Sequence, residues 1–398
     1  MDFEDARTIG ARLRQIRNSR KKSLRVIAGL AGISKAHLSR IERGERALDR
    51  RSEIVALANA LQISPSELTA LPIPAPVDGD ADAGIAAVRL ALMAVNEGQP
   101  GGRVVPVEAL RARVTAVLDA RCRCDRQDEA GAALPELIRD LATSIYAGRD
   151  VAELLSLTVL LHTQGTSAWL RVVGGPVDLR SQSATVARHA AGDLDNPTAM
   201  GIATVGSVGV MLTAGAFGLA QNALDSVTVP TDTSGGLQLD GMLALSRSLV
   251  AAADNRPGDV QAPLEHAAEL ARHAGEGNAF WMGFGPINVG LWRVAEALES
   301  GDYERAVTTA ESLHPEAHPN VTRRAAYWVD YGRALARMRG RRKDTILALR
   351  RAETISPLHL HRSPLARGTL AELVTIHLQQ DALGRELRGM AYRAGLPV

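Results

Sequence analysis

Four cationic side chains and several small ones lie close together near the N-terminus of the chain. They fall within residues 31–46, AGISKAHLSRIERGER. With 100° between successive residues of a helix, one arc of about 140° holds side chains of both kinds, Lys35, Ala36, Ser39, Arg40 and Arg43. Leu38 and Ile41 point the other way. The stretch is therefore expected to form a helix with one exposed cationic face and one buried apolar face.

Cations beside small side chains suit contact with a nucleic acid. The DNA major groove admits one α-helix, where Lys35 and Arg40 can reach guanine acceptors and Ala36 can meet a thymine methyl group. Flexible cations and helix N-termini bind DNA phosphates, which positions the protein on the duplex without recognising the base sequence. Four residues are placed for this second role, Ser23, Ser39, Arg43 and Arg46. The alternative is a charged helix whose arginines are merely solvated.

Five short helices are predicted to position this stretch. Ile9, Leu13 and Ile16 recur at helical spacing, which indicates a first helix over residues 6–20. The others are predicted over 23–30, 34–43, 51–61 and 65–70, with N-caps at Ser23, Ser34 and Ser64. The third helix is expected to end at a glycine, Gly44. Its apolar face is expected to pack against apolar residues of the second helix and the turn, Ile27, Leu30 and Ile33.

Residues 9–70 resemble the Cro/C1-type (XRE family) helix-turn-helix that phage repressors share. The stretch 31–46 matches its turn, recognition helix and following loop. The resemblance implies a DNA-binding domain in which five residues of the third helix read or approach the bases, Lys35, Ala36, His37, Ser39 and Arg40. Many members begin the second helix with a glutamine that contacts phosphate. Because Leu24 stands there, the expected phosphate contacts are Ser23, Arg25, Arg43 and Arg46.

Charge divides the chain into a basic head and a mildly acidic body. The whole chain has 46 Lys and Arg against 44 Asp and Glu, of which residues 1–71 hold 14 against 8 and residues 72–398 hold 32 against 36. The head (1–71) is therefore the part suited to a polyanion. The segment LPIPAPVDGDADAG favours a linker over residues 72–84, and 398 residues exceed one compact core.

The body (85–398) is predicted to be helical throughout, so the fold class is all-α. Two stretches, beginning at Gly301 and Gly340, each offer a helix end, an amphipathic helix and a proline stop. They resemble the tetratricopeptide repeat, which implies an α-solenoid of helix pairs. The whole chain also resembles actinobacterial regulators that join such a head to helical repeats. Related RRNPP regulators bind signalling peptides, so the resemblance implies an effector without identifying it.

Aromatic residues make up only 3% of the chain, so their clustering carries information. Phe280, Phe284 and the neighbouring tryptophans lie near two asparagines, and tyrosines follow in the next repeat. The candidate effector site comprises Asn278, Trp281, Asn288, Trp292, Tyr327, Asp330 and Tyr331. Amides can hold a peptide backbone and aromatics can supply contact area. The alternative is that these rings pack between helices.

Two features bear on where the protein works. Residues 196–224 contain no charge and are long enough to cross a bilayer, but their glycines favour two closely packed buried helices. The N-terminus shows no export signal, and Cys122 and Cys124 fit reduced thiols, with a thiol switch as the alternative because arginines flank them. A cytoplasmic protein outside the membrane is expected.

No pattern of a catalytic or metal site is found. Of the four lysines none follows a glycine-rich loop, which excludes a Walker-type nucleotide site. The histidines of HPEAHP (314–319) and HLHR (359–362) lack metal-ligand spacing, so they are expected on the surface or in loops. We expect no enzyme, no cofactor and no metal.

These observations predict a sequence-specific transcriptional regulator. Two heads would meet half-sites about 34 Å apart on a double-stranded DNA operator, so a homodimer is expected. Likeness to phage repressors favours repression, although the direction of regulation and the operator are left open. The body would sense a peptide or small molecule. The alternative is a repeat-domain adaptor for another protein, with a degenerate head.

Overall fold

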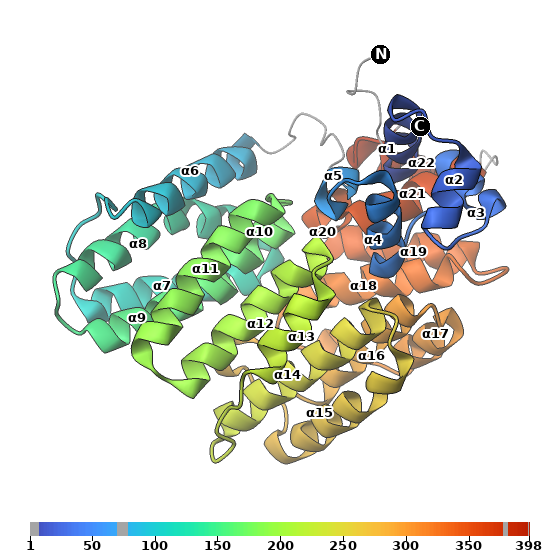
Figure 1. Cartoon of the computed structure of the whole chain (residues 1–398). Coiled ribbons are helices and arrows are strands. Elements are labelled where there is room, and N and C mark those ends of the chain that lie inside the picture. Colours follow the sequence, from blue (N-terminus) through green and yellow to red (C-terminus); the bar gives the residue numbers. More distant parts are fainter. Residues whose placement is uncertain (1–7, 70–78, 377–380, 397) are drawn as a thin grey trace.

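The structure is a computed structural model that describes residues 8–69, 79–376, 381–396 and 398. Every regular element within these residues is a helix, which confirms the predicted all-α class. A small N-terminal bundle lies against a long curved series of helices (Figure 1). Leucine, alanine and valine fill the core positions, as the low aromatic content requires.

The head consists of five helices close to the predicted ranges. They are α1 (Ile9–Ser19), α2 (Leu24–Leu30), α3 (Lys35–Glu42), α4 (Arg51–Leu61) and α5 (Pro65–Thr69). The predicted N-caps are confirmed, since the hydroxyls of Ser23, Ser34 and Ser64 accept from the backbone N–H three residues on. Gly44 follows α3 with a φ of 74°, the left-handed conformation expected there.

Close contact between α1 and α3 holds the head together. A Cβ atom at Gly10 would lie 2.0 Å from the Ile41 carbonyl oxygen, so only glycine allows this approach. At the other end of the contact, Arg17 donates to both carboxylate oxygens of Glu42 at 2.6 and 2.8 Å. This hydrogen bonding raises the pKa of Arg17. The C-terminal end of α3 is therefore held against both ends of α1.

The body continues with seventeen α-helices in the described residues. Its first part contains α6 (Gly79–Asn96), α7 (Val107–Cys122), α8 (Gln127–Tyr146), α9 (Val151–Leu160), α10 (Ala168–Val172), α11 (Val177–Leu194), α12 (Pro197–Ala214) and α13 (Phe217–Asp225). Its second part contains α14 (Ser234–Ala253), α15 (Gln261–Ala274), α16 (Pro286–Ser300), α17 (Tyr303–Glu311), α18 (Val321–Leu335), α19 (Arg342–Ile355), α20 (Pro357–His361), α21 (Pro364–Ile376) and α22 (Ala382–Arg393).

Five short helical segments lie between the α-helices of the described part of the body. They are η2 (Cys124–Arg126), the π-helix η3 (Leu161–Ser167), η4 (Pro257–Asp259), η5 (Ala279–Trp281) and η6 (Pro315–Ala317). One boundary differs from the prediction, because residues 79–84 form the start of α6 rather than linker. Alanines and early aspartates in this stretch favour a helix N-terminus. Residues 70–78 of the predicted linker lie outside the described residues.

Successive helices pack in pairs, as expected of a repeat-like body. The pairs α16 with α17 and α18 with α19 correspond to the two stretches identified in the sequence. Gly301 and Gly340 take left-handed φ values of 78° and 76° where α16 ends and before α19 begins. In the second pair, Gly332 of α18 allows Leu349 of α19 to approach closely. Small residues thus set the spacing of the paired helices.

The uncharged segment 196–224 forms two helices of the body. Gly215, with a φ of 74°, separates α12 from α13. By length and composition α12 could cross a membrane, and it is the one helix among the described residues that could. Half of its apolar window is buried, where α12 packs against α11 and α14. This is the arrangement that the prediction of two packed helices requires.

The body curls until its early and late helices meet. Trp281 Nε1 donates to Asp119 Oδ1 at 2.7 Å, which joins η5 to α7. Arg362 donates to Asp82 at 3.2 Å, which joins the end of α20 to α6. The head then lies against the late helices (Figure 1). Between these contacts lies a central cavity of about 1050 Å³ that is partly open to solvent.

Candidate nucleic-acid interface and central cavity

The two faces of α3 are arranged as the sequence predicts. Leu38 and Ile41 are fully buried in the core of the head. Lys35, Ala36 and Arg40 are exposed on the opposite face. Neither Lys35 nor Arg40 forms a hydrogen bond or ion pair with any residue that the structure describes. Their charges are therefore available to a partner outside the chain.

The other residues predicted on this helix are already engaged. His37 is half-buried, with Nε2 3.8 Å from the Glu53 carboxylate. Arg43 donates to Ser39 Oγ at 2.6 Å and to both oxygens of Glu45 at 2.6 and 2.8 Å. The hydrogen bond to Glu45 raises the pKa of Arg43. Any contact of Ser39 or Arg43 with a phosphate must therefore compete with these bonds.

The remaining candidates for phosphate contact surround α3. Ser23 and Arg25 are exposed at the start of α2. Arg46 is half-buried where the head meets α21. Leu30 corrects one prediction, because it is 66% exposed and does not cover the apolar face of α3. Ile27 and Ala28 fill that place, since they lie on the inner side of α2 and Leu30 lies on the outer side.

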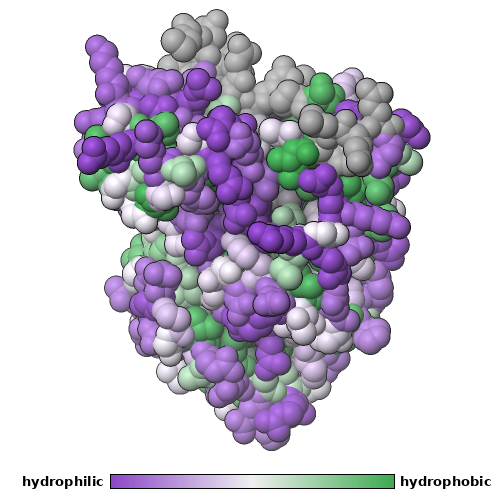
Figure 2. All heavy atoms as spheres, turned by 90° about the vertical axis from the view of Figure 1, so that its right-hand side faces the viewer, coloured by the Kyte–Doolittle hydropathy of each residue, from purple (hydrophilic) through white to green (hydrophobic). Residues whose placement is uncertain are grey.

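Figure 2 views the side of the molecule that carries α2, α3, α17 and α19 in Figure 1. Hydrophilic residues dominate this face, and hydrophobic ones are scattered between them. Such a surface suits a charged partner better than an apolar one.

The helices of the head belong to a known domain type. Residues 8–71 match the family model of a helix-turn-helix domain. The match spans α1 to α5 and ends before the body, so it identifies the head and leaves the body unassigned. No curated protein and no solved structure matches the chain significantly.

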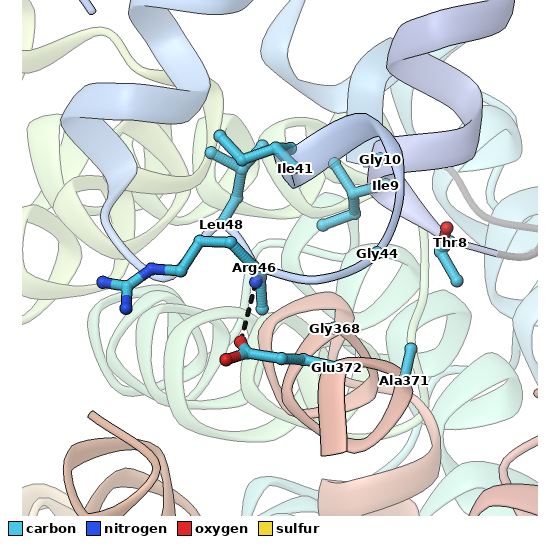
Figure 3. A pocket seen from close by; sticks show the side chains of 11 residues that line it. Thr8, Ile9, Gly10, Ile41, Gly44, Arg46, Leu48, Gly368, Ala371 and Glu372 are labelled. Atoms are coloured by element: carbon cyan, nitrogen blue, oxygen red, sulfur yellow. Dashed lines mark hydrogen bonds between the residues drawn. The ribbon is translucent and has the colours of Figure 1, made fainter. Parts of the chain in front are cut away.

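Two acidic side chains of the body accept hydrogen bonds from the helix-turn-helix domain. Glu372 of α21 accepts from the Ala47 N–H at 2.7 Å, beside the small hollow between the two parts (Figure 3). Glu299 of α16 accepts from the Arg51 N–H at 2.9 Å and pairs with the Arg51 guanidinium. Both carboxylates are buried, so these contacts between the domain and the body are shielded from water.

Part of the predicted effector site lines the central cavity. Trp281, Trp292 and Asp330 do so. Asn288 and Tyr327 do not, because both are buried in packing roles. The Asn288 side chain accepts from Arg323 at 3.1 Å, and the Tyr327 hydroxyl donates to the Ala310 carbonyl at 2.8 Å.

Two further members of the predicted effector site lie outside the cavity wall. Asn278 is exposed in the loop before η5. The Tyr331 hydroxyl donates to Glu311 at 3.1 Å. The aromatic cluster is therefore partly core and partly cavity wall.

Seven arginines line the cavity, and the sequence did not predict any of them as part of the effector site. They are Arg51, Arg121, Arg171, Arg180, Arg323, Arg333 and Arg362. They come from the head and from helices across the body, so no local spacing could have brought them together. The surroundings of Arg171 in the wall, followed by the charges of Arg180 and other arginines, lower its pKa, although its side chain is exposed to the open space of the cavity. Arg171 stays charged at neutral pH in a cationic cavity.

The thiols and histidines give no sign of a redox or metal site. Burial raises the pKa of Cys122, and it raises that of Cys124 to about 11, which opposes the thiol-switch alternative. In the described part of the chain no three His, Cys, Asp or Glu side chains are grouped to hold a metal ion. His318 lies in a loop, as expected, but it is fully buried there and joins Gly283 to Asn320.

Proposed function

We propose that this chain is a sequence-specific DNA-binding transcriptional regulator of the cytoplasm. The helix-turn-helix match identifies the kind of domain. The observation that carries the proposal is the exposed, unpartnered pair Lys35 and Arg40 on a helix whose apolar face is buried. A helix so anchored can enter the major groove without disturbing the domain core.

Roles follow from the surroundings of each side chain. Lys35 and Arg40 read guanine edges, and Ala36 meets a thymine methyl group. His37 and Ser39 lie close to the bases, held by Glu53 and Arg43. The phosphates are contacted by the surrounding residues, Ser23, Arg25, Arg43 and Arg46.

The body is proposed to be of the tetratricopeptide-like type and to carry the homodimer contact and an effector site. Two domains on a palindromic operator would lie about 34 Å apart, one turn of DNA. An effector can change DNA binding only through different affinities for different arrangements of the heads. The proposal includes no catalytic step.

The direct test compares single variants on an operator selected from genomic fragments. Arg40→Ala should weaken operator binding by about 1 to 3 kcal/mol and relax the preference at one base pair. Arg46→Ala should weaken binding to operator and random DNA alike. Arg272→Ala, on the exposed side of α15, is the matched control and should change neither. Unchanged operator binding by both Arg40→Ala and Arg46→Ala would refute the proposal.

The adaptor alternative predicts a different response to salt. A protein that neutralises phosphates releases counterions, so its DNA affinity falls steeply as the salt concentration rises. An adaptor with a degenerate head should show weak binding without preference for any sequence. Competition by random DNA at several salt concentrations separates the two functions.

A further inference from the structure

The central cavity has the size of a small-molecule site and is open to solvent on part of its surface. Its volume of about 1050 Å³ lies near the upper end of ligand pockets in proteins. The wall combines α4 and α5 of the head with helices of the body from α7 to α21. The π-helix η3 contributes Thr163, Gln164 and Ser167, and π-helical turns are frequent at functional sites.

Four arginines in this wall have no ion pair among the described residues. Arg121 and Arg180 reach only neutral oxygens, at 3.3 Å to Trp281 O and 3.3 Å to Thr213 Oγ1. Arg323 donates to the Asn288 amide, and Arg171 has no hydrogen-bond partner in the described chain. The Nε atoms of Arg121 and Arg180 are buried without a partner.

The same wall holds four carboxylates, Glu67, Asp178, Glu299 and Asp330, against seven arginines, and none of the four forms an ion pair with Arg121, Arg171, Arg180 or Arg323. Glu299 pairs with Arg51, and Asp330 pairs with Arg333 at 2.7 Å while attracting Arg323 from a greater distance. Asp178 is largely exposed and lies 3.7 Å from Arg89. The four arginines are therefore left with an excess of positive charge that no acidic side chain in the wall neutralises.

Such an excess costs free energy where the cations are buried, as Arg121 and Arg180 are. Desolvation disfavours the charged form of a cation, and like charges add to the penalty. Consistent with this, burial and then the charge of Arg51 lower the pKa of Arg180 to about 10. An anion inside the cavity would remove the penalty, because guanidinium groups pair well with phosphate and carboxylate.

An apolar surface adjoins the cationic one. The Arg323 guanidinium lies 5.4 Å from the centre of the Trp292 ring. Trp281, Met242 and Leu249 also line the cavity. A ligand that satisfies both surfaces carries anionic groups beside an aromatic or apolar portion.

We propose that the cavity binds a small organic polyanion, carrying phosphate or carboxylate groups, between Arg121, Arg171, Arg180 and Arg323. This ligand is the effector of the regulator, so its regulatory role rests on the proposed function. Arg51 and Val55 of α4 and Pro65 of α5 border the same cavity. A bound anion therefore favours the arrangement in which the head closes the cavity wall, and DNA and ligand affinities are linked.

The test measures binding of four probes to the full chain at constant ionic strength: pyrophosphate, citrate, ADP and triglutamate. At least one should bind in calorimetry and raise the melting temperature. Arg171→Gln and Arg323→Gln should weaken that binding by at least about tenfold. Arg272→Gln, which removes a cation from the outer side of α15, should leave it unchanged. The preferred probe distinguishes a phosphorylated compound, a polycarboxylate and an acidic peptide.

The difference in melting temperature between Arg171→Gln and the wild type should change sign when the ligand is added. This change separates ligand binding from a purely structural role of Arg171. Without any anion, Arg171→Gln should melt at a higher temperature than the wild type, because a repelled charge is removed. With the preferred probe the order should reverse. If no probe binds, or if all three variants bind alike, the proposal is overturned. DNA binding is measured separately, so failure here leaves the proposed function standing, and loss of DNA recognition leaves the cavity result intact.

Discussion

The Arg337 guanidinium lies 2.7 Å from the Asp49 carboxylate, and the two side chains are only 1% and 3% exposed. Arg337 also donates to both oxygens of Glu372, at 2.9 and 2.5 Å. Arg333 donates to the Asp49 carbonyl at 2.5 Å. The loop between α3 and α4 is thus held by the end of α18 and by α21. The segment that joins α3 to α4 is consequently fixed to the body.

Removing Arg337 should release the head from the body. Breaking one partner of a buried ion pair costs about 3 to 5 kcal/mol, because the other charges stay buried and unpaired. Arg337→Met should therefore speed amide hydrogen exchange in α4 and α21, whereas the exposed pair of Arg126 and Glu129 is a control whose loss should change little. Unaltered exchange in both helices would show that the pair does not hold the head.

Two glycines of the head should respond to alanine in opposite directions. At Gly10 a Cβ atom collides with the Ile41 carbonyl, so Gly10→Ala should destabilise the head by about 1 to 3 kcal/mol. At Gly29, in the last turn of α2, a Cβ atom meets nothing within 4 Å. Gly29→Ala should stabilise the helix by about 0.5 to 1 kcal/mol. Chemical denaturation of both variants checks the pair, and a stable Gly10→Ala protein would contradict the described crossing of α1 and α3.

Freeing Arg43 should strengthen binding to DNA of any sequence. In the wild type Glu45 occupies the Arg43 guanidinium. Glu45→Gln removes this competitor, so affinity for random DNA should rise and the slope of log affinity against log salt should steepen by about one. Glu304→Gln, an exposed carboxylate on α17, should leave the slope unchanged. A slope that Glu45→Gln does not alter would mean that Arg43 contacts no phosphate.

Acid should weaken the protein partly through His318. Its Nε2 lies 3.0 Å from the Gly283 carbonyl and its Nδ1 accepts from the Asn320 N–H, so the buried ring fits the neutral form. Burial, followed by the charge of Arg323, lowers the pKa of His318 to about 4. The unfolded chain, with a pKa near 6.5, then binds more protons between these values. Stability should therefore fall as the pH falls from about 6.5 to about 4.

The size of this effect is about 3 kcal/mol at most, and denaturation midpoints across that pH range measure it. His318→Gln keeps a donor and an acceptor but cannot titrate, so its midpoint should fall less steeply. His189→Gln, exposed on α11, should follow the wild type. Identical curves for all three proteins would rule out a contribution from His318.

Local signals made the head predictable. The caps at Ser23, Ser34 and Ser64 depend on residues three positions apart, and the two faces of α3 depend on helical periodicity alone. The exposure of Leu30 was missed because periodicity shows that one side of a short helix is apolar but does not show which residues a neighbouring helix covers.

The cavity could not be predicted in the same way. Arg121, Arg171 and Arg323 come together only because α7, α10 and α18 meet when the body curls. The aromatic cluster was a partial signal, since Trp281 and Trp292 do border the cavity. Asn288 and Tyr327 belong to the same cluster in the sequence, but they are buried away from the cavity. Asn288 is hydrogen-bonded to Arg323 there and Tyr327 to Ala310.

The contacts between the helix-turn-helix domain and the body limit which domains could replace the head. One side of α4 supplies Leu57 to its own bundle, while Arg51 at its start satisfies Glu299 of α16. A helix-turn-helix domain transplanted from another protein would leave Glu299 as a buried acid without a cation, and it would remove Asp49 and the Ala47 N–H from Arg337 and Glu372. Chimaeras made by exchanging the first 71 residues should therefore require matched changes on α16 and α21 before they fold as one unit.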